Sequence, residues 1–97
     1  MDLHKILNEH HLAFNRFADL IGVGDKTLRK YEYEDGSISE RSVEKIEMAL
    51  DILDNCEIVW PVYHSYKYNF NRDMWMDEVY ECNAAFKSLL EAEGYFS

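Results

Sequence analysis

Residues 25–30, D-K-T-L-R-K, concentrate side chains that could bind nucleic acid. Lys26 and Lys30 are four positions apart, so a helix would place them on one face, with Arg29 beside them. Lysine pairs with the acceptor edge of guanine, and a carboxylate such as that of Asp25 accepts a hydrogen bond from cytosine. Together with Thr27, the three cations form a short polar surface, which we call the basic ridge. It is a candidate DNA-binding surface, and an ordinary solvated helix face is the alternative.

Apolar spacing predicts two short helices that would hold the basic ridge outward. The first covers about residues 14–21 and the second about residues 25–32. Gly22 lies between them, where the chain must leave the first helix through a left-handed conformation that favours glycine. The residues expected to turn inward are Phe17, Ala18, Ile21, Val23, Leu28 and Tyr31. Two packed helices joined by such a tight turn form a helix-turn-helix unit.

Two further helices are predicted on either side of this unit, at about residues 2–8 and 40–54. Each has apolar residues at helical spacing on one face. These are Leu3, Ile6 and Leu7 in the first, and Val43, Ile46, Leu50 and Leu53 in the second. The run Ser37-Ile38-Ser39-Glu40 has capping-box spacing and would start the second of these helices.

Residues 3–53 resemble the Xre/Cro-type helix-turn-helix family of phage repressors. The similarity consists of F-A in the first helix of the unit, G-V in the turn, T-L-R-K-Y-E in the second helix, and S-V-E-K-I-E-M-A-L-D-I-L in the closing helix. The resemblance implies a compact five-helix fold, DNA binding and an origin in a phage or mobile element. It also implies that Asp25, Lys26 and Lys30 reach base edges, with Thr27 and Arg29 nearer the phosphates.

The sequence departs from this family at two places. Ala13 and Phe14 occupy the positions where the family has a threonine cap and a glutamine that binds a DNA phosphate. Losing the cap costs about 1 kcal/mol of helix stability. Glu34 and Asp35 follow the second helix, where the family often has a basic loop, and their carboxylates would repel phosphate.

The second half of the chain, residues 56–97, lies beyond the resemblance and carries ten of the fourteen aromatic residues. Tyr66, Tyr68 and Phe70 alternate with polar residues, which predicts a half-buried strand or an extended arm within residues 63–72. Asp73 is the expected cap of a long helix, and Gly94 its end. A seam along this helix would consist of Trp75, Val79, Cys82, Phe86 and Leu89. We therefore expect a helix-turn-helix domain at residues 1–55, and a second segment that completes its core or forms an interface.

Composition excludes several classes of protein. The sequence has no apolar run near the ~20 residues that cross a membrane and no secretory pattern, which predicts a cytoplasmic location. Cys56 and Cys82 have no metal or redox spacing and are expected to be reduced and buried. The adjacent His10 and His11 are expected to be exposed rather than to bind metal. No phosphate loop, nucleophile elbow or cofactor motif is present, so we expect neither an enzyme nor a cofactor.

Two functions remain, and the net charge of −9 separates them. The first is a DNA-binding transcriptional regulator, expected to act as a homodimer because one short recognition helix supplies little affinity. The second is an acidic helix-turn-helix scaffold that inhibits a basic nucleic-acid-binding protein, as an antirepressor or anti-CRISPR-like protein does. The residues expected at a partner interface are Trp75, Val79, Phe86, Glu34 and Asp35. The basic ridge favours the first function, and the acidic loop favours the second.

Overall fold

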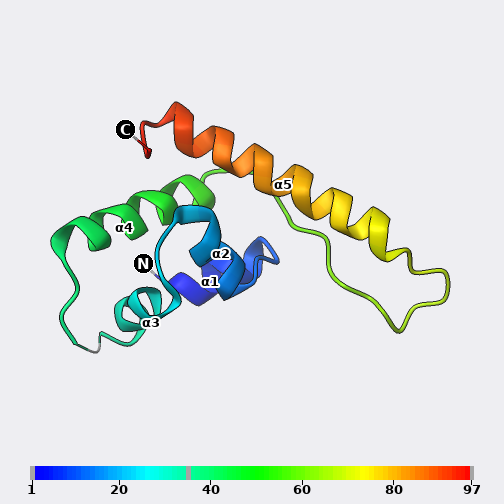
Figure 1. Cartoon of the computed structure of the whole chain (residues 1–97), viewed down its shortest axis with the longest axis horizontal. Helices are drawn as coiled ribbons and strands as arrows, with labels where there is room; N and C mark the ends of the chain where they lie inside the picture. Colours follow the sequence, from blue (N-terminus) through cyan, green and yellow to red (C-terminus); the bar gives the residue numbers. More distant parts are fainter. Residues whose placement is uncertain (1, 35, 97) are drawn as a thin grey trace.

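The computed structural model describes residues 2–34 and 36–96, and these fold as an all-α bundle (Figure 1). The helices are α1 (Leu3–Glu9), α2 (Phe14–Ile21), α3 (Asp25–Tyr33), α4 (Glu40–Asp54) and α5 (Arg72–Ala92). The expected all-α class is confirmed. Four of the helices lie within the stretch that resembles the repressor family, and the fifth is the long C-terminal helix.

The segment before α5 is an arm and not a strand, so the strand alternative for residues 63–72 is wrong. Residues 57–71 contain turns and irregular backbone, and no strand occurs in the part of the chain that the structure describes. The arm leaves the bundle, turns at its tip and returns to the start of α5 (Figure 1).

Polar side chains cap three helices at positions that differ in part from those expected. Asp2 accepts from the amide of Lys5 at the start of α1. Ser39 caps α4 by accepting from the amide of Ser42 at 3.2 Å, so the predicted capping box from Ser37 is wrong. Asn71, and not Asp73, caps α5. Each cap satisfies an amide that the first helical turn leaves without a backbone partner.

The turn between α2 and α3 has the predicted geometry. Gly22 ends α2 with a φ of 70°, in the left-handed region. The amide of Val23 then donates to the carbonyl of Ala18 at 3.1 Å, which closes the turn. Gly94, with a φ of 76°, follows the end of α5 in the same way.

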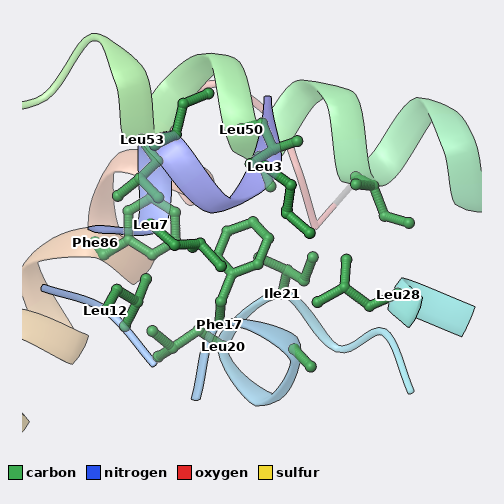
Figure 2. Packing of buried hydrophobic residues seen from close by; sticks show 14 of the residues in the cluster. Leu3, Leu7, Leu12, Phe17, Leu20, Ile21, Leu28, Leu50, Leu53 and Phe86 are labelled. Atoms are coloured by element: carbon green, nitrogen blue, oxygen red, sulfur yellow. The ribbon is translucent and has the colours of Figure 1, made fainter. Parts of the chain in front are cut away.

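Both halves of the chain contribute to one hydrophobic core (Figure 2). Phe86 of α5 is fully buried, with its ring 6.5 Å from that of Phe17 and 5.9 Å from that of Trp60. Val79 and Phe86 are therefore core residues, and the expectation that they form a partner interface is wrong; Trp75 is half-buried against the core. Residues 56–97 thus complete the core of residues 1–55.

Hydrogen bonds hold the beginning of the arm on the bundle. The ring of His10 donates through Nδ1 to the carbonyl of Ile58 at 2.5 Å, and the amide of Trp60 donates to the carbonyl of His10 at 2.8 Å. The indole of Trp60 donates to Asn83 at 2.9 Å, and that of Trp75 to Pro61 at 3.0 Å. His10 is only 7% exposed, so the expectation of an exposed side chain was wrong for this histidine.

Candidate nucleic-acid interface

The helix α3 presents the basic ridge to solvent, as predicted. Leu28 is fully buried and Tyr31 packs half-buried against the core, so these two residues fix the inner face of the helix. On the outer face Lys26, Arg29 and Lys30 are exposed, as is Asp25, while Thr27 is half-buried. The first helix of the helix-turn-helix, α2, is anchored in the core by its buried residues Phe17, Ala18, Leu20 and Ile21.

A cluster from three helices holds Arg29 in place. Its guanidinium carbon lies 5.1 Å from the centroid of the Phe14 ring, within the range of a cation–π contact. The same ring stacks on His4 of α1, with centroids 6.2 Å apart. His4 in turn donates through Nε2 to Glu32 of α3 at 2.5 Å. Phe14, the first residue of α2, is therefore a platform for Arg29.

The surroundings of Glu32 lower the pKa of its carboxyl and so favour the charged form. Burial raises the pKa of its carboxyl, but hydrogen bonds from His4 and Tyr33 and the nearby charges of His4 and Arg29 lower it more, so the net pKa is lowered from its usual value. The partner of this carboxyl on α1, His4, is 28 residues away in the sequence. The packing of α1 on α2 and of α2 on α3 brings the two side chains together.

The start of α2 lies next to this cluster and lacks a side-chain cap. Ala13 is the N-cap residue and makes no side-chain hydrogen bond, as expected from the sequence. Asn15 accepts from the amide of Arg16 at 2.9 Å and so satisfies one donor of the first turn. The positive end of the helix dipole is therefore close to Arg29, because Phe14 is the first residue of α2. Uncapped amides and a nearby guanidinium together favour an anion such as phosphate.

Lys30 differs from the other cations of the basic ridge because it borders an acidic cleft. The cleft encloses about 600 Å³, and its acidic lining residues are Asp2, Glu32, Glu34 and Glu47. The stem of Lys30 lies along the backbone at Gly36, 3.7 Å from where a Cβ would stand. Tyr31 also lines this cleft, and its pKa is raised by burial and by the charge of Glu47. Asp35, expected at a partner interface, lies outside the described residues.

Charge is distributed unevenly over the helices. The helix-turn-helix, residues 14–33, holds four basic and three acidic residues, while the whole chain has a net charge of −9. The helices α4 and α5 each hold five acidic and two basic residues. The local charge is therefore positive only where α2 and α3 meet solvent.

Other kinds of site find little support among the described residues. No group of three histidine, cysteine, aspartate or glutamate side chains gathers in a way that could hold a metal ion in residues 2–34 and 36–96. Within the same ranges, no helix combines the length and apolar character needed to cross a membrane.

The chain was compared with models of protein families, with curated proteins and with solved structures, and none of the three comparisons gave a match. The similarity of residues 3–53 to repressor-type helix-turn-helix proteins therefore depends on the residues quoted above.

Proposed function

We propose that this protein is a DNA-binding regulator that places the outer face of α3 in the major groove. The observation that carries the proposal is the exposure of Lys26 and Arg29 on a helix whose opposite face is anchored by the fully buried Leu28. A rigid helix with a basic outer face, joined to a second helix by a tight turn, is the geometry that reads base edges in helix-turn-helix proteins.

Each part of the interface has a distinct role in this proposal. Lys26, in the first turn of α3, reaches base edges, where lysine pairs with guanine. Arg29, held on Phe14, binds a backbone phosphate beside the uncapped start of α2. Lys30 contributes less than either, because the carboxylates of Glu34 and Glu47 line the cleft that it borders.

The binding must be sensitive to salt. Each contact to phosphate releases condensed counterions, so affinity falls as salt rises, with a shallow slope because few cations touch the duplex. The acidic surroundings of Lys30 add repulsion at short range. We therefore expect weak binding that is strongest at low ionic strength.

The test is selection from a pool of random duplexes, followed by polarisation titrations of the selected duplex across salt. We expect Lys26→Ala to weaken binding by about 5- to 150-fold, since a good base contact is worth about 1–3 kcal/mol. Lys87→Ala is the matched control, because it removes the same charge from an exposed site on α5. Failure to enrich any duplex, or equal behaviour of the two variants, would contradict the proposal.

A second function is favoured by one observation, the acidic cleft beside α3. The cleft is lined by the apolar residues Leu3, Ile38 and Val43 and by four carboxylates. The negative charge of these carboxylates would attract the cationic side chains of a basic protein. In this alternative the protein inhibits a nucleic-acid-binding protein by occupying its basic surface. In that case Glu34→Lys would abolish capture of the basic protein, whereas Lys26→Ala would have little effect on that capture.

A further inference from the structure

The tip of the arm, Tyr66 to Tyr68, exposes large aromatic side chains, of which Tyr66 contacts His64 with its hydroxyl 2.9 Å from Nδ1. Tyr68 is 94% exposed and Tyr66 is 80% exposed, with Lys67 between them. Tyrosine buries a large area at low entropic cost and is enriched at protein interfaces. Side chains of this kind indicate a contact surface that the isolated chain leaves open.

The tip has a defined shape. Tyr63 packs against Phe70, with ring centroids 4.9 Å apart, and against Trp75 of α5 at 4.8 Å. Within the tip, the amide of Lys67 donates to the carbonyl of His64 at 2.9 Å. The tip is therefore held before any partner binds, which reduces the entropy lost on association.

A groove of about 580 Å³ lies between the base of the arm and α5. Val59 and Val62, 52% and 45% exposed, form part of its apolar lining. Glu78 and Glu81 of α5 line the same groove and carry its negative charge. The groove thus offers an apolar surface with carboxylates beside it.

The tip and the groove are complementary to each other. The two tyrosine rings match the apolar lining, and the ammonium group of Lys67 between them matches the carboxylates of Glu78 and Glu81. Because one chain carries both surfaces, a two-fold axis would create each contact twice. In its own chain the tip lies beside the groove without filling it: Lys67 and Tyr68 line an adjoining pocket with Val62 and Glu78, and Tyr68 remains 94% exposed.

The charge of the tip fits a groove on a second copy of this chain. Two molecules of net charge −9 repel each other, so a stable pair needs local contacts that offset this repulsion. Residues 55–71 hold one acidic and one basic residue, and that basic residue, Lys67, would meet the carboxylates of Glu78 and Glu81 on the acidic α5 of the other copy. The arm also lies at the opposite end of the molecule from α3 (Figure 1), so this contact leaves the basic ridge free.

We propose that the protein forms a two-fold dimer in which the tip of each arm, Tyr66 to Tyr68, occupies the groove lined by Val59, Val62 and Glu81 of the other copy. The contact does not require DNA. Its use, which is to present two α3 helices to two half-sites, rests on the function proposed above.

The experiment is sedimentation equilibrium of the full chain over a range of protein concentrations, without DNA. We expect the double variant Tyr66→Ser, Tyr68→Ser to raise the dissociation constant of the dimer by at least about 30-fold, because exposed aromatic anchors dominate such interfaces. Tyr33→Ser is the matched control, since Tyr33 is 67% exposed on α3, away from the arm. Circular dichroism checks that each variant is folded.

A charge exchange tests the pairing itself. Lys67→Glu and Glu81→Lys are each expected to weaken the dimer about tenfold, and the double variant to recover most of the loss. Lys87→Glu makes the same charge change on α5 outside the groove and should have little effect. Each single reversal should also reduce the salt dependence of dimerisation.

Three outcomes would overturn the proposal. These are a monomer at every concentration, a dimer that the tyrosine and charge variants leave unchanged, and a monomer whose arm tyrosines are needed to bind a different protein. Loss of DNA binding with an intact dimer would instead remove only the function proposed above, because the mass is measured without DNA.

Discussion

Two adjacent leucines on α5 provide a sharp test of how the second half of the chain joins the core. Leu90 is fully buried, whereas Leu89 is 37% exposed. The predicted seam contained Leu89 and omitted Leu90, so the structure and the sequence pattern make opposite predictions for the same substitution. We compare Leu90→Ala with Leu89→Ala, since both remove the same atoms from neighbouring positions of one helix.

The expected difference follows from burial. Removing a fully buried leucine side chain costs its transfer free energy and leaves a cavity, which together amount to about 2–5 kcal/mol. Alanine and leucine have similar helix propensities, so Leu89→Ala should cost less than about 1 kcal/mol. Domains of this size are stable by only about 5–15 kcal/mol. Leu90→Ala should therefore lower the melting temperature by roughly 8–40 °C, since each kcal/mol is worth about 4–8 °C in a domain of this size.

Urea unfolding measured by tryptophan fluorescence is the assay. Trp60 is 2% exposed and lies beside Phe86, so its emission reports on the junction of the arm, α5 and the core. The free energy of unfolding is extrapolated to water for each variant. Equal slopes of this free energy against urea concentration show that the two variants expose similar surface on unfolding. Equal losses in the two variants, or a larger loss for Leu89→Ala, would refute the packing of α5 described above.

Two further predictions concern the helix-turn-helix unit. Gly22→Ala should destabilise the protein by about 1–2 kcal/mol in thermal unfolding, because Gly22 has a φ of 70°. Gly24→Ala should change it by less than about 0.5 kcal/mol, since Gly24 has a φ of −64°, and equal effects would contradict the assignment of strain. Because the pKa of Glu32 is lowered on folding, its contribution to stability is present above pH 4.5 and is lost as the pH falls through the lower folded value. Glu32→Gln should therefore flatten the melting temperature against pH in that acidic range, and an unchanged curve would contradict the role of His4.

The sequence predicted most of the fold because local signals agreed with tertiary packing. Helical spacing of apolar residues set the bounds of α2 and α4 correctly, and Gly22 marked the turn. The errors arose where two neighbouring residues satisfied the same local rule. Asp73 can cap a helix as well as Asn71 can, and the choice depends on where the turn of the arm ends. Leu89 and Leu90 both suit a period of 3.6, and the choice depends on how α5 crosses the bundle.

The basic ridge was predictable, but the contacts that control it were not. Lys26, Arg29 and Lys30 are close in sequence, so helical geometry alone places them together. The platform formed by Phe14 depends on α1, α2 and α3 meeting at one point, and no spacing within a single helix encodes this. The available signal was a large aromatic residue at the first position of α2. Such a residue needs a partner, and Arg29 and His4 provide it.

The net charge of −9 is an incomplete guide to whether this protein can bind DNA, because about four of the nine net negative charges, those of α5 and Glu93, are far from α3. At physiological ionic strength the Debye length is about 8 Å, while the principal extents of the molecule are 46, 29 and 19 Å. The acidic residues of α5 lie on a helix that packs on α4, across the bundle from α3 (Figure 1), so salt screens most of their effect. The carboxylates that lie near the basic ridge are those around Lys30, and Glu34 is among them. Whether this protein prefers DNA or a basic protein as its partner therefore depends on the local charges between Lys26 and Glu34 rather than on the total charge.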